Sequence, residues 1–480
     1  MQHLRQHMPL IKIFNRFSSS QQQSKMRHSQ SSKPEWKSHS KNKKVIIRSP
    51  GALWEPFREV LSDQEADKTS VVDGSMALEG IGAAARFWGV APHEAHERAA
   101  DTVTPLWRLD YGRQLTMKQA RVRALLRQLA GRLVGSAPPA NGCGSNALPF
   151  PLDRIVPSQP QVDGYRNKEE YKIGEGVDGD PKTVGFIFSS PAHGPALCLP
   201  GDRLKNCKPQ HARLALAFQD FVRTSPLAAC SRLDDGGHWR LLMVRSNRAD
   251  QLLAAVTFHP QQLPVAAVEA ERQRLREYFS SGLGAACGLH SLLFQECPHA
   301  RCSAEQAPYQ SLFGPGVLED RLGPVRFLVS PDSFFQVNCA AAEVLYGVVR
   351  RQARLTPASV LLDLCSGTGP VSLLMARHCR TCVGIEASRS AVRDANENAA
   401  MNNIQNVEFI AGRIEKELSP VVADLDLCSD MVAVVNPGRD GVGWTGAAFP
   451  VDTRRARRSV PAHGPSGAGA DLREVVSVLT

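Results

Sequence analysis

Hydrophobic residues in the last third of the chain fall into short runs that are separated by segments of helical periodicity. The runs "SVLLDL", "TCVGI", "VEFI" and "MVAVV" each have the length of one strand. A helical pattern occupies residues 343–355, 370–379 and 389–403, before and between these runs. Short apolar strands that alternate with helices are typical of a parallel sheet covered on both faces. We therefore predict an α/β domain at residues 331–442.

The middle of the chain, residues 101–330, has a different pattern. Apolar residues recur at helical spacing within residues 103–133 and predict one amphipathic helix there, through Leu115, Val122, Leu125, Leu126, Leu129 and Leu133. After a linker rich in Pro, Gly and Asn, turn residues separate candidate strands at 183–188, 238–246 and 252–258, and a candidate helix follows at 265–279. We predict a helix followed by a β-rich α+β domain.

The two ends of the chain lack such patterns. Residues 1–100 consist of a polar leader and an Ala/Glu/Gly stretch, and we expect little order there. Residues 443–480 are rich in Gly, Ala, Pro and Arg, a composition typical of disorder. The parallel sheet is therefore expected to stop at the strand that ends before Asn436, which would leave an exposed apolar edge.

The net charge of +10 is concentrated at the start of the chain. Residues 1–50 contain 11 Lys and Arg residues and one acidic residue, Glu35, so the remaining residues are balanced in charge. An acid-free, Ser-rich basic leader resembles an organelle presequence and predicts a mitochondrial matrix location. A disordered basic tail is the alternative.

The cysteine and hydropathy patterns narrow the class of protein further. Twelve cysteines lie at wide spacings without a secretory signal, which favours a reducing compartment. The single CxxC motif, Cys379 to Cys382, lacks a second ligand pair, so we expect two buried thiols and no metal site. Since no apolar run reaches about 18 residues, we expect no membrane span.

Candidate cofactor residues follow three of the predicted strands. Gly367 and Gly369 form a Gly-x-Gly turn after the first strand, Glu386 follows the next strand, and Asn436 ends a later one. The carboxyl ends of parallel strands share one edge, where glycines allow close approach and an acid accepts ribose hydroxyls. A dinucleotide site would use a third glycine, which is absent, so S-adenosylmethionine is favoured and NAD is the alternative.

The motifs "SPDSFFQVN", "DLCSGTG", "GIE" and "NPGRDGV" occur in the order and spacing of the uracil-5-methyltransferases of tRNA and rRNA. The segments "VTPLWRLDYGRQL", "DGYRNKEEYKI" and "DGDPKTVGF" are also similar to that family, and most similar to its mitochondrial branch. The resemblance covers about residues 100–442. It implies a Rossmann-like S-adenosylmethionine-dependent methyltransferase domain, here with a truncated sheet, after a β-rich α+β domain.

The resemblance also implies roles for individual residues. Gln336 would contact the methionine part of the cofactor, Gly367 and Gly369 its nucleoside, and Glu386 its ribose. Asn436, where many relatives have Asp, would contact the cofactor and face the uracil. The alternatives are that Gln336 bonds neighbouring backbone and that Asn436 caps a helix.

The expected RNA partner is tRNA, small-subunit rRNA or both, bound by a monomer. Tyr165, Arg166 and Lys168 are candidates for base stacking and phosphate contacts, although Arg166 and Lys168 also fit a solvated face. Phe334 and Phe335 are expected in the core.

The catalytic residues that the resemblance implies are missing from residues 443–480. The family uses a cysteine thiolate that adds to C6 of uracil, and a glutamate base near the C-terminus. No cysteine follows Cys428, and the one later glutamate, Glu474, has no family context. We expect this chain to be inactive, with full activity in a longer form. A non-catalytic RNA- or cofactor-binding isoform is the alternative.

Overall fold

The computed structural model describes residues 81–134, 148, 152–158, 160–188, 194–230, 236–300, 304–425, 430–437 and 472–477. The basic leader and most of the expected low-order N-terminal region lie outside these residues.

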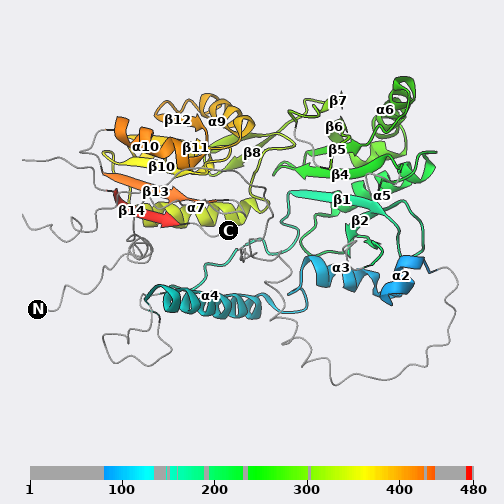
Figure 1. Cartoon of the computed structure of the whole chain (residues 1–480), viewed down its shortest axis with the longest axis horizontal. Coiled ribbons are helices and arrows are strands. Elements are labelled where there is room, and N and C mark those ends of the chain that lie inside the picture. Colours follow the sequence, from blue (N-terminus) through cyan, green and yellow to red (C-terminus); the bar gives the residue numbers. More distant parts are fainter. Residues whose placement is uncertain are drawn as a thin grey trace, which may run out of the picture. The chain divides into compact units, whose positions relative to one another are not determined.

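The first β-sheet has seven strands in the order β3-β2-β1-β4-β5-β6-β7 (Figure 1). Its strands are β1 (Lys168–Gly174), β2 (Thr183–Ile187), β3 (Cys198–Leu199), β4 (Trp239–Ser246), β5 (Leu252–Phe258), β6 (Leu289–Glu296) and β7 (Gln310–Phe313). All neighbours are antiparallel except β5 and β6, which the helix α6 (Val265–Ser280) connects. The predicted strands and helix of this region are confirmed.

An aromatic core supports this sheet. Trp239 of β4 packs edge-to-face on Phe258 of β5, with ring centroids 4.9 Å apart, and Phe218 and Phe221 of α5 (Pro209–Thr224) pack on Trp239. The buried indole donates a hydrogen bond of 3.0 Å to the Ser225 hydroxyl, so its polar group is satisfied. Every residue of β5 is buried, which explains its uninterrupted apolar sequence.

The N-terminal segment is more ordered than its composition predicts. It forms α2 (Ala83–Trp88), the 3-10 turn η3 (Pro92–Glu94), α3 (Ala95–Val103) and α4 (Tyr111–Val134). The prediction of a single helix within 103–133 is wrong at its N-terminal end, because the chain turns between α3 and α4. The Asp110 carboxylate accepts a hydrogen bond of 2.9 Å from the backbone N–H of Arg113. This bond caps α4.

The C-terminal region contains a five-stranded, fully parallel sheet of order β12-β11-β10-β13-β14. The strands are β10 (Val360–Leu364), β11 (Thr381–Glu386), β12 (Val407–Ala411), β13 (Met431–Val435) and β14 (Leu472–Ser477). The helices are α7 (Cys339–Ala353), α8 (Pro370–Met375), α9 (Arg389–Met401) and α10 (Ile414–Asp424), with the 3-10 turn η5 (Ala376–His378) after α8. This arrangement confirms the α/β prediction.

The two faces of this sheet bury alternate residues of the same strands. Leu361 and Val432 share one core with α7, α8 and α9, whereas Leu362 and Ala433 share the other with α10. The antiparallel hairpin β8 (Leu318–Leu322) and β9 (Val325–Val329) precedes α7 and contributes to the first of these cores. In the described part of the chain, no helix has the length and hydropathy of a membrane span.

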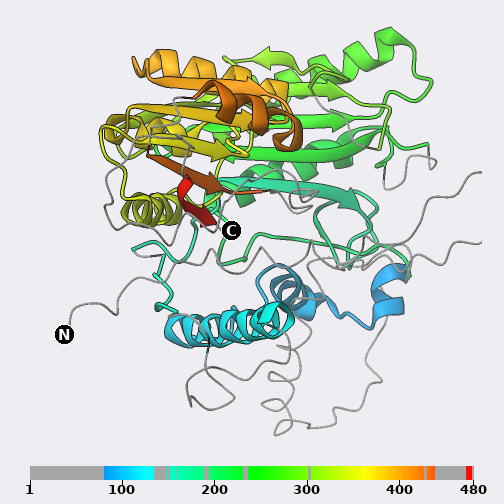
Figure 2. The same cartoon turned by 60° about the vertical axis from the view of Figure 1, so that its left-hand side comes forward.

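The expectation that β13 forms an exposed edge is wrong. Leu472–Ser477 runs parallel to β13 as β14, with Ala433 in register with Val475, and both views show the two strands side by side (Figure 2). The composition of residues 443–480 did not indicate this strand, because its six residues are a small part of a Gly- and Pro-rich segment.

Candidate active site

The Gly-rich turn after β10 is the centre of the candidate site. Gly367 and Gly369 have φ angles of +57° and +82°, which non-glycine residues rarely adopt. A Cβ atom on Gly369 would lie 2.6 Å from the Phe409 ring, whereas one on Gly367 would meet nothing within 4 Å. Packing therefore requires the second glycine, and the first leaves an open space beside the turn.

Glu386 at the end of β11 is joined directly to this turn. One carboxylate oxygen accepts a hydrogen bond of 3.0 Å from the backbone N–H of Gly367, and the other accepts one of 2.9 Å from the N–H of Ser388. Each oxygen keeps a second lone pair for another donor. The structure thus brings together two of the predicted cofactor residues from two adjacent strands.

Asn436 lies at the same edge of the sheet. Leu364 of β10 is in register with Ile385 of β11 and Val435 of β13, so the residues that follow these strands are neighbours. The backbone N–H of Asn436 donates to the Leu364 carbonyl at 3.2 Å. The predicted convergence of three strand ends is therefore present in the backbone.

The segment that carries Gln336 is fixed from two sides. The Thr368 hydroxyl donates to the Phe334 carbonyl at 3.4 Å, which joins the segment to the Gly-rich turn. Buried Asn167 donates from its side chain to the Gln336 carbonyl at 2.9 Å and from its backbone N–H to the Val337 carbonyl at 2.9 Å. The Gln336 amide nitrogen is buried and makes no hydrogen bond of normal geometry within the described structure, although Tyr346 of α7 interacts with this side chain.

Asp363 supports the Gly-rich turn, a role that was not predicted from the sequence. It is fully buried under the turn, where one carboxylate oxygen accepts hydrogen bonds from the N–H (3.0 Å) and hydroxyl (2.8 Å) of Ser372 in α8. Burial raises the pKa of Asp363 to about 6, although the Ser372 hydrogen bonds oppose the shift. The sequence could have indicated this role, because Asp363 is the first residue of the Asp-x-x-x-Gly-x-Gly motif.

Cys365 is a partly exposed thiol at this edge. Burial, followed by the nearby Glu386 and Asp363 carboxylates, raises the pKa of Cys365 to about 11. Because the reactive form of cysteine is the thiolate, this thiol is a poor nucleophile at neutral pH.

The two phenylalanines before Gln336 differ in environment. Phe335 is 4% exposed and packs on Phe327, as expected, whereas Phe334 is 62% exposed. The core prediction is therefore wrong for Phe334, whose carbonyl contacts the turn while its ring is accessible to solvent.

The predicted RNA-contacting residues flank Asn167 and are half-buried. Burial raises the pKa of Tyr165 and lowers that of Lys168, whose ammonium group pairs with Glu170 at 2.9 Å. Since Asn167 bonds Gln336, this segment adjoins the candidate site. Because these side chains are half-buried, the alternative of a fully solvated face is wrong for them.

The CxxC motif lies at the opposite end of β11. The Cys379 and Cys382 sulfurs are buried and 3.3 Å apart, as two packed thiols. Among the residues whose placement is described, no group of three His, Cys, Asp or Glu side chains could hold a metal ion.

Comparisons with known proteins match the region that contains the candidate site. A methyltransferase domain family matches residues 355–437, which contain the turn, Glu386 and Asn436. The chain is 41% identical over 355 residues to human tRNA (uracil-5-)-methyltransferase homolog B, covering 72% of this chain and 69% of the relative. The zebrafish (Danio rerio) homolog B is also 41% identical, over 348 residues, covering 72% of each chain.

A solved structure also aligns with much of the chain. It is the Pyrococcus abyssi tRNA (uracil-54, C5)-methyltransferase in complex with S-adenosyl-L-homocysteine, which is 20% identical with a TM-score of 0.48, over 70% of this chain and 68% of that chain. The match to a methyltransferase domain supports S-adenosyl-L-methionine as the cofactor. With relatives of this identity and coverage, the chain belongs to the tRNA (uracil-5-)-methyltransferase family.

Proposed function

We propose that the candidate site binds S-adenosyl-L-methionine and serves the methylation of C5 of uridine in tRNA. Family membership supports the reaction, since the relatives are named tRNA (uracil-5-)-methyltransferases. The observation that carries the site assignment is the hydrogen bond from Gly367 to Glu386, which connects the glycine turn to the acid of the next strand.

The residues at this edge fit the proposed cofactor. The Glu386 carboxylate keeps acceptor capacity for ribose hydroxyls, and the open space beside Gly367 leaves room for a nucleoside. The buried amide nitrogen of Gln336, which lies near Tyr346 and makes no hydrogen bond of normal geometry in the described structure, would donate to the carboxylate of the methionine part. When bound, the cofactor supplies an electrophilic methyl group, and we propose that Asn436 orients the acceptor base.

We infer that these 480 residues bind the cofactor but do not complete the transfer. C5 of uracil becomes nucleophilic only after a thiolate adds to C6. Burial and the nearby carboxylates raise the pKa of the Cys365 thiol to about 11, so little of the thiolate is present at neutral pH. Exposed Phe334 and the segment Tyr165–Arg166 support RNA binding, because aromatic rings stack on unpaired bases.

Two measurements test this proposal. Titration calorimetry of the full chain with S-adenosyl-L-homocysteine should show binding that the E386Q substitution weakens. Transfer of a labelled methyl group to unmodified tRNA, with small-subunit rRNA as a second substrate, should show no turnover. Methylation by this chain would contradict the inactivity, and absence of cofactor binding would leave a purely RNA-binding protein.

We also propose that the chain acts as a monomer in the mitochondrial matrix. The basic, acid-free residues 1–34 support the location. Fusing residues 1–50 to a fluorescent protein should direct it to mitochondria, and a diffuse signal would contradict this. Sedimentation equilibrium tests the monomer.

A further inference from the structure

The helix α4 is strongly basic. Its 24 residues include six arginines and lysines and no acidic residue, although the chain outside the leader is balanced in charge. Among its residues 111–128 none is buried. The helix therefore presents most of its charge to solvent.

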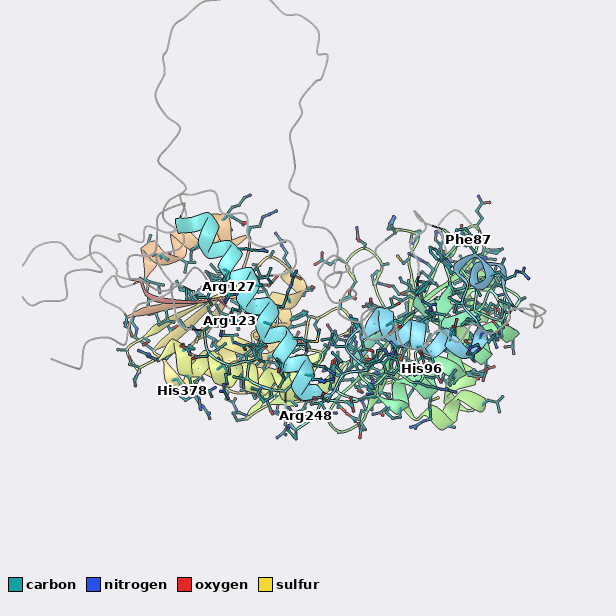
Figure 3. All side chains as sticks on the ribbon, turned by 90° about the horizontal axis from the view of Figure 1, so that it is seen from below. Phe87, His96, Arg123, Arg127, Arg248 and His378 are labelled. Carbon is teal, nitrogen blue, oxygen red and sulfur yellow. The ribbon has the colours of Figure 1, made fainter. Side chains whose placement is uncertain are left out.

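Three of the arginines form one stripe. At 100° per residue, Arg113, Arg123 and Arg127 lie within about 80° of one another around the helix. All three are exposed, and Figure 3 labels Arg123 and Arg127 on α4. Arg113 has an exposed partner, Asp110, at 3.7 Å, whereas Arg123 and Arg127 have no ion-pair partner among the described residues.

The start of α4 is tethered to the candidate site. The Tyr111 hydroxyl accepts a hydrogen bond of 2.7 Å from the backbone N–H of Ser158. The Ser158 hydroxyl accepts one of 3.1 Å from the side chain of Asn338, which caps α7 two residues after Gln336. A helix of 24 residues is about 36 Å long, and its first residue is joined through Ser158 to the segment that carries Gln336.

Further along the helix, Gln119 fixes α4 to residues 153–155, which follow it in the chain. Its side-chain carbonyl accepts from the N–H of Ile155 at 2.7 Å, and its amide donates to the carbonyl of Asp153 at 3.0 Å. These bonds hold the first half of α4 in one orientation. A fixed row of guanidinium groups suits a ligand with regularly spaced anionic groups.

We propose that the arginine stripe of α4 (Arg113, Arg123 and Arg127) binds the phosphate backbone of the tRNA whose uridine is held at the candidate site. The inference rests on the proposed function. An anionic membrane surface is the competing partner, because Val122 and Leu125 are 36% and 40% exposed and basic amphipathic helices also bind such surfaces. RNA is favoured because the tether runs to the segment that carries Gln336 in the candidate site.

Fluorescence anisotropy of the full chain with labelled, unmodified tRNA tests the stripe. The R123Q/R127Q variant should bind about tenfold or more weakly at 0.1 M KCl. The slope of log K against log salt should fall by about two, since two phosphate contacts are lost. R123K/R127K should keep the wild-type slope. The R213Q/R276Q control removes two exposed arginines of α5 and α6 and should bind as wild type.

Each result has a distinct meaning. If wild-type protein binds tRNA and R123Q/R127Q binds with equal affinity and salt slope, the stripe is not the contact and the proposed function survives. If wild-type protein binds S-adenosyl-L-homocysteine but no tRNA, both proposals fail. Vesicles containing phosphatidylserine complete the test: loss of vesicle binding in R123Q/R127Q with unchanged tRNA binding would assign the stripe to a membrane.

Discussion

The backbone N–H of Gly367 donates a hydrogen bond of 3.0 Å to the carboxylate of Glu386, 19 residues later in the chain. With the second bond from Ser388 at 2.9 Å, both carboxylate oxygens are held at the edge of the sheet. The acid is therefore oriented by the protein itself, without requiring a ligand, and its remaining lone pairs can accept from ribose hydroxyls.

The E386Q substitution should weaken S-adenosyl-L-homocysteine binding by at least tenfold. The amide keeps one acceptor oxygen but places an NH₂ group against a backbone N–H, and hydrogen bonds to charged groups contribute about 1.5–3 kcal/mol. Titration calorimetry measures the loss. E408Q removes the same charge from an exposed position on β12 and serves as the control. Equal affinities of the two variants would contradict the role of Glu386.

The two glycines of the turn should respond differently to alanine. G369A places a Cβ atom 2.6 Å from the Phe409 ring at a φ angle of +82°, so it should destabilise folding by several kcal/mol. G367A meets no neighbour, and its left-handed φ costs about 1–2 kcal/mol.

Urea denaturation of G367A, G369A and the double variant G369A/F409L measures these differences. F409L shortens the side chain that the new methyl group meets, so it should recover part of the stability that G369A loses. Equal destabilisation by G367A and G369A would show that close packing against Phe409 is not the reason why position 369 requires glycine.

Asp363 should make stability depend on pH below neutrality. Its pKa is raised from 3.8 to about 6, so between these values the folded protein binds more protons than the unfolded chain. The contribution of this group to the free energy of unfolding is therefore greatest below pH 4. It falls by about 3 kcal/mol as the pH rises to 6, since one pKa unit corresponds to about 1.4 kcal/mol.

Comparison with D363N isolates this effect, because the other carboxyl groups titrate in both proteins. The stability of wild type relative to D363N should decrease from pH 4 to pH 6 and then remain level. S372A removes the hydroxyl bond that opposes the shift, keeps the bond from the backbone N–H, and should move the end of the decrease to higher pH. A difference that is constant with pH would refute the raised pKa.

Local sequence patterns predicted the parts of the fold that depend on neighbouring residues. The apolar runs of β10 and β13 and the glycine turn have strong local signals, and the order of strands in an α/β unit places their carboxyl ends together. The site assignment of Glu386 and Asn436 to one edge followed from this rule alone.

Features that depend on distant contacts could not be read in the same way. The bond from Asn167 to Gln336 spans 169 residues, and no local pattern reports it. Phe334 and Phe335 lie in an irregular segment between β9 and α7, where Phe335 packs on the distant Phe327 and Phe334 is exposed. The break before α4 could have been predicted from Asp110, because aspartate is a favourable N-cap residue. The apolar periodicity continues across this position and therefore indicated one helix.

The pairing of β14 with β13 gives a last prediction. Without β14, the buried apolar strand β13 would be an unpaired edge that can associate with another chain. Alternate residues of a strand direct their N–H groups to opposite sides, so the V475P/V476P variant removes a donor toward β13 whichever residue supplies it. This variant should melt at a lower temperature and scatter more light on incubation at 37 °C than V475T/V476T, which keeps both N–H groups. Identical melting and scattering of the two variants would show that β14 does not protect this edge in solution.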